Sequence, residues 1–261
     1  MVPLCLSHNA LLLSAHSDGR VFFVIPWGEV SIIGTTDTDY DGDPDTVEPE
    51  TSDIDYLLTE TKRVLPRAKL DRTAVLYSYA GLRPLVRSKG DPPWRVSREH
   101  RIVEHASGMF TVLGGKYTTY RAVAEQVVDR VVKQLQPTDA KCCETANRRL
   151  PGAEVDDFDA YIRDRTQFWR EKLPGSEWYV SSLVGRYGTE FERILELAQR
   201  DPRLLQPIAG GVSHILAEIV YTYLHEMAIT LDDTLRRRLG VCLLGITEEQ
   251  VRRRLESATE T

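Results

Sequence analysis

Short apolar runs dominate the first third of the chain, and their lengths and spacing predict β-strands. Residues 21–26 and 30–34 are two such runs on either side of Trp27 and Gly28, so we expect them to form a hairpin. Residues 51–65 instead show helical spacing, and Pro66 follows them as a stop. The other strands predicted from the pattern are residues 10–14, 73–79, 95–104 and 109–113.

A long amphipathic helix is predicted after the last of these strands. Apolar residues recur three or four positions apart from Val123 to Leu135, which is the spacing of one helix face. Gly114 and Gly115 separate the strand from the helix. Thr118 or Thr119 is expected to cap the first turn of the helix.

The connection between this strand and helix has the composition of an anion-binding turn. Backbone N–H groups at the start of a helix lack partners within the helix, and the positive end of the helix dipole lies at the same place. Glycine lets a flat ligand approach the backbone, and Lys116 adds a full positive charge. A strand-to-helix turn without any ligand has the same features, so this stretch alone leaves both interpretations open.

Beyond residue 136 the pattern becomes helical nearly throughout. Residues 137–147 are polar and are interpreted as a linker, followed by a helical domain over residues 148–261. The chain is therefore predicted to be α+β: an antiparallel or mixed sheet with a strand–helix unit in residues 1–136, then an all-α C-terminal domain. The helices expected there are residues 155–172, 177–186, 189–200, 213–229 and 247–257.

Composition and charge narrow the possible functions. The 261 residues suffice for one large domain or two small ones, with 42% hydrophobic and 28% charged residues, as in ordinary globular proteins. A net charge of −6 argues against generic nucleic-acid binding. The arginine runs at residues 236–238 and 252–254 lie among carboxylates, so we interpret them as solvated helix faces.

The cysteines and the lengths of the apolar runs indicate where in the cell the protein is expected. Four cysteines show neither metal-ligand spacing nor a disulfide framework, which favours a reducing, cytoplasmic location. No run approaches the roughly 20 apolar residues that span a bilayer, so no transmembrane segment is expected. The sequence leaves undecided whether the protein binds peripherally to the inner membrane.

A series of motifs then occurs in a fixed order. Residues 23–27, 33–37 and 79–85 come first, residues 114–121 follow, and residues 225–228 and 231–238 lie in the predicted helical domain. In this order they resemble the flavin-dependent glycerol-3-phosphate dehydrogenases, from about residue 9 to the end. That family begins with a dinucleotide-binding unit carrying G-x-G-x-x-G, a pattern that this sequence lacks. The sequence is therefore expected to be the C-terminal part of such an enzyme.

The resemblance implies an activity and its partners. The family oxidises sn-glycerol 3-phosphate to dihydroxyacetone phosphate, moving a hydride to FAD, with the quinone pool as the usual later acceptor. Residues 1–136 would then hold part of the substrate-binding, flavin-facing domain. A homodimer is a further expectation, because a part of a larger fold exposes apolar surface.

Individual residues take roles from the same resemblance. Lys116, with Gly114, Gly115, Tyr117 and Thr118, would contact the flavin and stabilise negative charge on it. Arg83 would hold the substrate phosphate through its planar fork of donors, and Lys116 and Arg83 are the two catalytic candidates. Arg98 and Thr36 are further substrate-binding candidates, although an ion pair and a solvated loop account for them equally well.

Two questions stay open at this point. None of the six histidines stands out as the base, and His225-Glu226 lacks the second histidine of a zinc helix. An oxidase that passes electrons to oxygen, an amino-acid oxidase of the same flavin class, and a non-catalytic helical interaction module are the alternatives to the dehydrogenase.

Overall fold

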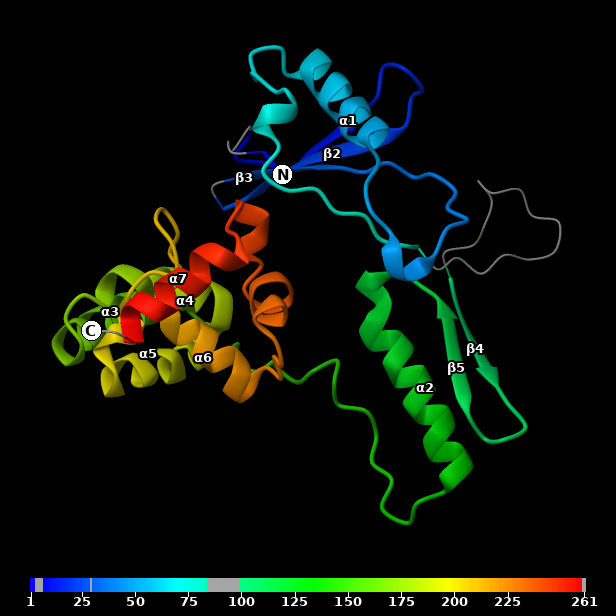
Figure 1. The fold of residues 1–261 in the computed structure, drawn as a ribbon. Coiled ribbons are helices and arrows are strands. Elements are labelled where there is room, and N and C mark those ends of the chain that lie inside the picture. Colours follow the sequence, from blue (N-terminus) through cyan, green and yellow to red (C-terminus); the bar gives the residue numbers. More distant parts are fainter. Residues whose placement is uncertain (3–6, 29, 84–98, 260–261) are drawn as a thin grey trace. The chain divides into compact units, whose positions relative to one another are not determined.

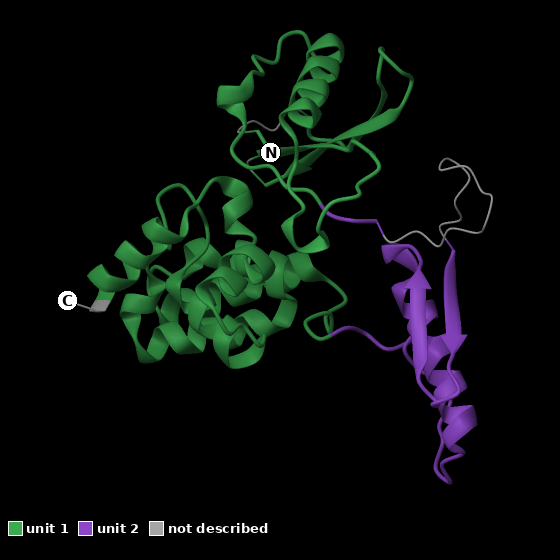
Figure 2. Ribbon diagram, turned by 45° about the vertical axis from the view of Figure 1, so that its right-hand side comes forward, with its two compact units in different colours: residues 1–80, 151–261 green, residues 81–150 purple. Residues whose placement is uncertain are grey.

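The computed structural model describes residues 1–2, 7–28, 30–83 and 99–259 (Figure 1). The chain forms two compact units, one of residues 1–80 with 151–261 and the other of residues 81–150 (Figure 2). Small antiparallel sheets and a helical C-terminal region confirm the mixed α and β architecture in outline. The predicted boundaries at residues 136 and 148 stay a prediction.

The first unit begins with a three-stranded antiparallel sheet of β1 (Leu11–Ser14), β2 (Val21–Trp27) and β3 (Val30–Gly34), with β2 in the centre. Val24 lies opposite both Leu11 and Ile33. Phe22 and Val24 are buried while Val21 and Phe23 are exposed, which is the alternation of a sheet with one covered face. The predicted hairpin is confirmed, and Gly28 adopts a positive φ of 57° at its turn.

Helix α1 (Thr51–Val64) supplies the cover for this sheet. Leu57 and Tyr56 pack against the cluster that contains Phe22 and Val24. The helix starts where the sequence predicts, because the carboxylate of Asp53 accepts a hydrogen bond from the backbone N–H of Glu50 at 3.1 Å. This reciprocal cap satisfies donors that the first turn leaves unpaired.

The strand predicted over residues 73–79 is absent, and this prediction was wrong. The carboxylate of Asp71 accepts hydrogen bonds from the backbone of Thr73 and Ala74 and turns residues 72–74 into a short 3₁₀-helix. The following residues run as an irregular segment, in which the backbone N–H of Leu76 bonds to the carbonyl of Met1 at 2.9 Å. The alternation of apolar residues in this stretch therefore reflects contacts of a single segment, not a sheet ladder.

Within its described residues, the second unit contains one hairpin and one α-helix. Strands β4 (His100–Glu104) and β5 (Phe110–Gly114) pair antiparallel, and helix α2 (Tyr120–Leu135) follows. Three residues of α2 spaced four apart touch the hairpin. Gln126 bonds to His100, Arg130 bonds to the carbonyl of Ile102, and the Gln134 amide lies beside Gly108.

None of the described residues of this second unit is buried. Val128 and Leu135, which the pattern places on the apolar side of α2, are 57% and 71% exposed. The expected helix is therefore present, but its apolar residues do not form an enclosed core within the described part of residues 81–150.

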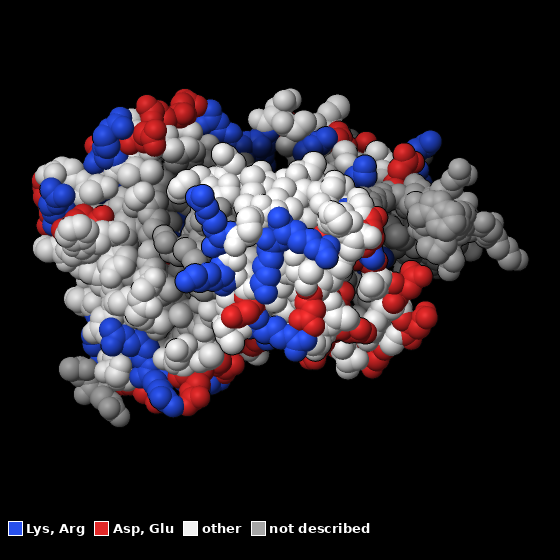
Figure 3. All heavy atoms as spheres, turned by 90° about the horizontal axis from the view of Figure 1, so that it is seen from above, with Lys and Arg blue, Asp and Glu red and all other residues white. Residues whose placement is uncertain are grey.

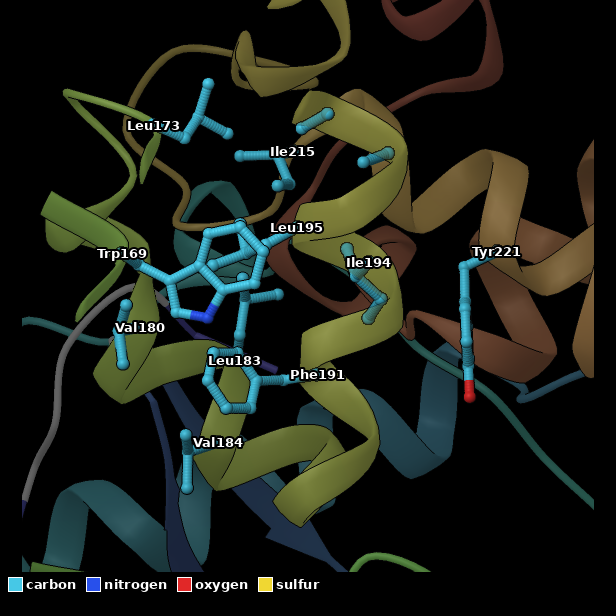
Figure 4. Packing of buried hydrophobic residues seen from close by; sticks show 12 residues of the cluster. Trp169, Leu173, Val180, Leu183, Val184, Phe191, Ile194, Leu195, Ile215 and Tyr221 are labelled. Carbon is cyan, nitrogen blue, oxygen red and sulfur yellow. The ribbon is translucent and has the colours of Figure 1, made fainter. Parts of the chain in front are cut away.

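The helical C-terminal region contrasts with this. It contains α3 (Phe158–Lys172), α4 (Glu177–Tyr187), α5 (Phe191–Arg200), α6 (Leu216–His225) and α7 (Glu248–Thr259), close to the predicted helices. Trp169, Phe191 and Ile194 are at most 1% exposed and lie in one cluster with side chains from α4 and α6 (Figure 4). The indole of Trp169 also donates a hydrogen bond to Glu192 at 3.0 Å.

A buried ion pair links α4 to α6 within this region. Arg186 contacts the carboxylate of Glu218 with two nitrogens at 3.0 Å, and Glu218 caps α6 by accepting from the backbone of Ile215 at 2.8 Å. Burial raises the pKa of Glu218, and Arg186 opposes that rise. His214 is buried as well, and burial together with the positive charge of Arg186 lowers its pKa to about 4.

Four arginines of the two arginine runs form ion pairs with nearby carboxylates, while Arg238 and Arg254 donate to backbone carbonyls. Arg236 and Arg237 bond to Asp232 at 3.2 and 3.1 Å, and Arg252 and Arg253 pair with the glutamates one helical turn earlier. On the face shown in Figure 3, acidic and basic side chains both occur between uncharged areas. Within the described part of the chain, every helix is too short or too polar to cross a bilayer.

Candidate functional site

The turn from Gly114 to Thr118 is shaped by its two glycines. Gly114 and Gly115 adopt positive φ angles of 68° and 100°, which residues with side chains rarely adopt. A Cβ atom on Gly115 would lie 3.3 Å from the Cβ of His100, so the turn also passes close to strand β4. Glycine is therefore required here by conformation and by space.

The backbone N–H groups of this turn are open to a ligand. Within the described residues, no acceptor is found for the N–H groups of Gly115, Lys116, Tyr117 and Thr118. The next N–H groups are used internally, since Thr119 donates to the carbonyl of Lys116 at 3.0 Å. Lys116 itself is exposed. The arrangement can stabilise negative charge on a ligand placed at the start of α2.

The predicted threonine cap is wrong. Thr119 occupies the cap position, but its hydroxyl donates to the carbonyl of Lys116 at 2.9 Å and makes no capping bond to α2. A short 3₁₀ turn, Tyr117–Thr119, precedes the helix and takes the place that a capped first turn would have.

Two tyrosines extend this surface. Tyr117 is 91% exposed and Tyr120 is 58% exposed, and their ring centroids lie 5.9 Å apart with the rings tilted by 34°. Large aromatic side chains are seldom left this open without a contact. Tyr117 follows Lys116 in the chain, and both residues are exposed at this turn.

Of the predicted site residues, the structure brings together those of one turn: Gly114, Gly115, Lys116, Tyr117 and Thr118. Arg83 is exposed and ends the described stretch before residue 99, while Arg98 lies outside the described residues. Thr36 is half-buried after β3, in the first unit. The roles assigned to Arg83, Arg98 and Thr36 therefore stay predictions.

Sequence reasoning missed the residues that support this turn. His100 lies opposite Gly114 in the hairpin, and its ring nitrogen Nε2 is 2.8 Å from the amide oxygen of Gln126 in α2. A signal was available in principle, because the pairing of β4 with β5 sets His100 beside the glycines. The contact with Gln126 depends on how α2 lies along the hairpin, which the sequence pattern does not determine.

Comparison with known proteins identifies two family models along the chain. Residues 3–130 match the FAD dependent oxidoreductase family, and residues 143–257 match the C-terminal domain of alpha-glycerophosphate oxidase. These two matches divide the chain between a flavin-enzyme portion and a helical portion.

Individual relatives carry a consistent name. A glycerol-3-phosphate dehydrogenase of Synechocystis sp. is 35% identical over 240 residues, which are 90% of this chain and 42% of that protein. Glycerol-3-phosphate dehydrogenase 2 of Mycobacterium tuberculosis is 37% identical over 230 residues, 87% of this chain and 38% of that protein. The chain thus spans about two fifths of the length of these curated relatives.

A solved structure supports the same relationship. The glycerol-3-phosphate dehydrogenase from Bacillus halodurans, complexed with FAD, superposes with a TM-score of 0.76 at 28% identity, over 97% of this chain and 53% of that one. The two family models, the named relatives and this likeness in fold agree with the motifs of residues 23–37 and 114–121. The chain belongs to the family of FAD-dependent glycerol-3-phosphate dehydrogenases.

Proposed function

We propose that the protein takes part in the FAD-dependent oxidation of sn-glycerol 3-phosphate to dihydroxyacetone phosphate. The observation that carries the proposal is the turn of Gly114 to Thr118, with four backbone N–H groups that have no acceptor within the described residues and an exposed Lys116 beside them. The names of the relatives supply the substrate, and the family supplies the cofactor.

The residues present fit one part of FAD. The isoalloxazine ring is flat and gains electrons, so it suits N–H donors and a lysine at the start of a helix. The pyrophosphate of a dinucleotide would need the G-x-G-x-x-G turn, which this sequence does not contain. The proposal for this chain therefore concerns contacts to the isoalloxazine, from Gly114, Gly115, Lys116, Tyr117 and Thr118.

Each proposed residue has a defined task. FAD, when bound, accepts the hydride that leaves the secondary carbinol carbon of the substrate. Lys116 and the N–H groups of residues 115–118 then stabilise the negative charge that arrives nearby. Arg83 and Arg98 hold the phosphate, for which a guanidinium offers two parallel donors, and Thr36 contacts a substrate hydroxyl.

We propose a quinone as the subsequent electron acceptor, which would bring the protein to the surface of the inner membrane. One observation favours a second candidate, since the family model for residues 143–257 is described from an oxidase. An oxidase passes electrons to oxygen and forms hydrogen peroxide. Peroxide released in step with the oxidation of glycerol 3-phosphate would support that candidate over the dehydrogenase.

The test is an anaerobic titration of the full chain loaded with FAD. Glycerol 3-phosphate is expected to bleach the flavin absorbance, and glycerol without the phosphate is expected to leave it unchanged. Arg83→Ala should weaken substrate binding by about 2–5 kcal/mol, the range found when a buried charge partner is removed. Arg101→Ala, an exposed arginine of the same unit, serves as the matched control. Bound FAD whose absorbance does not respond to glycerol 3-phosphate would refute the proposal.

A further inference from the structure

The turn of residues 114–118, whose N–H groups lack an acceptor among the described residues, directly follows strand β5 of the hairpin. His100 is the residue paired with Gly114 across β4 and β5. The backbone of Gly115 then passes so close to His100 that a Cβ on this glycine would be 3.3 Å from the Cβ of His100. The turn therefore passes close to β4 at this position, where glycine lacks the Cβ that would meet His100.

The same histidine reaches the helix side of the turn. Its Nε2 lies 2.8 Å from Oε1 of Gln126, which lies in the second turn of α2. A bond of this length between two side chains has ordinary hydrogen-bond geometry. His100 is therefore paired with Gly114 before the turn, lies close to Gly115 within it, and bonds to Gln126 in the helix after it.

Other contacts between α2 and the hairpin lie farther from the turn and are weaker. Arg130 reaches the carbonyl of Ile102 at 3.5 Å, which is the long limit of a hydrogen bond. Gln134 lies beside Gly108 at the opposite end of the hairpin. No described residue of this unit is fully buried, and Val123, Val127 and Val131 of α2 are half-buried, so the polar contact of His100 with Gln126 adds to a partial apolar packing.

We propose that His100 and Gln126 are positioning residues that hold the Gly114–Thr118 turn in the shape that stabilises reduced flavin. This rests on the proposed function for the role of the turn. The hydrogen bond from His100 to Gln126 holds the start of α2 against β4, and it thereby sets the path of the turn that joins β5 to α2. Neither residue contacts the flavin in this proposal, so both act through the N–H groups of residues 115–118.

The first measurement is the backbone ¹⁵N order parameter of residues 114–119 in the full chain without ligand. A rigid backbone gives values of about 0.85, and a flexible one gives values below about 0.6. His100→Ala and Gln126→Ala are each expected to lower these values toward the flexible range. His100→Gln, whose amide can still donate to Gln126, is expected to restore them.

The hairpin supplies a matched control. His105 makes a hydrogen bond of the same length, 2.8 Å, to Thr111 near the other end of β4 and β5. His105→Ala removes an exposed histidine and one side-chain bond from the same unit, but it should leave residues 114–119 unchanged. If His100→Ala unfolds the unit, Gln126→Ala tests the same bond from the helix.

The second measurement is the reduction potential of FAD bound to the full chain. Loss of the fixed turn should weaken binding of reduced FAD relative to oxidised FAD about tenfold, which lowers the potential by about 30 mV for a two-electron couple. The His105→Ala protein should keep the potential of the original protein. A purely structural role of His100 would change stability without this shift.

The outcomes separate the two proposals. Order parameters at residues 114–119 that do not respond to His100→Ala or to Gln126→Ala would overturn the positioning role and leave the proposed function intact. A turn that becomes flexible in both variants, in a chain that binds no FAD, would refute the proposed function for this chain while confirming that His100 and Gln126 hold the turn. A turn that loosens with no change of potential would refute the coupling to flavin.

Discussion

Two parts of this chain have similar amphipathic helices and very different interiors. In residues 158–259, Phe191, Ile194 and Leu195 of α5 are fully buried among side chains of neighbouring helices. In residues 81–150, helix α2 has the same kind of apolar periodicity, and none of its residues is buried. The difference shows that periodicity predicts a helix, whereas a core also needs enough surrounding elements to enclose it.

The physical reason is the number of elements. A two-stranded hairpin and one helix cover little apolar surface, and such small assemblies are marginally stable in water. Five helices packed around one another can close an interior from all sides. The proposed flavin-contacting turn therefore belongs to the less enclosed unit, in which single contacts such as His100 with Gln126 carry more of the order.

Among the variants that test this difference, Phe191→Ala is expected to have the largest effect on stability. Removing a fully buried phenylalanine leaves a cavity and should lower the free energy of unfolding by about 4 kcal/mol. Val128→Ala in α2 removes a side chain that is 57% exposed. This variant should change the free energy of unfolding by less than about 0.5 kcal/mol. Urea denaturation of the full chain measures the free energy of unfolding of both variants. Equal losses of stability in the two variants would contradict the difference between the enclosed helical region and the second unit.

A similar loss is expected from breaking the buried ion pair. Arg186→Met leaves the carboxylate of Glu218, whose side chain is 0% exposed, without its partner, and should destabilise the helical region by about 3 kcal/mol. The control is Arg253→Met, because Arg253 and Glu249 have side chains 74% and 72% exposed. Such exposed pairs contribute little. A loss below about 1 kcal/mol for Arg186→Met would show that the pair is solvated.

The third effect depends on pH. Burial lowers the pKa of His214 from 6.5 to about 4, and neither ring nitrogen has a hydrogen-bond partner among the described residues. Because the unfolded chain takes up the proton first, stability should fall as the pH drops from 6.5 to 4, by about 3 kcal/mol in total. Above pH 6.5 this contribution is fully present.

His214→Phe isolates this contribution. The difference in stability between the original protein and the variant should change by that amount between pH 6.5 and 4, while the opposite-signed contribution of Glu218 is present in both. If stability depended on pH in the same way in the original protein and in His214→Phe, then burial would not be lowering the pKa of His214.

The sequence predicted the helices and strands better than it predicted the contacts that these elements make. Strand β3, the hairpin at Trp27 and the five helices after residue 157 follow from local patterns. The predicted strand over residues 73–79 failed because Asp71 bonds to nearby backbone, a competition that an apolar pattern does not reveal.

For the site, the sequence identified the glycines and Lys116 because a strand, two glycines and a helix have a recognisable local order. It missed His100 and Gln126 because their contact joins residues 26 positions apart. The substrate contacts of Arg83, Arg98 and Thr36 and the flavin contacts of residues 114–118 are implied by the resemblance. The homodimer is expected from exposed apolar surface. All of these stay predictions.

Amide hydrogen exchange of the full chain tests the central contrast most directly. The buried helix α5 should exchange only through global unfolding of the helical region, at a rate that Phe191→Ala accelerates. Helix α2 should exchange at least about 100-fold faster than α5 and should not respond to Phe191→Ala, because it opens locally. Equal protection of α2 and α5, lost together in that variant, would contradict the account.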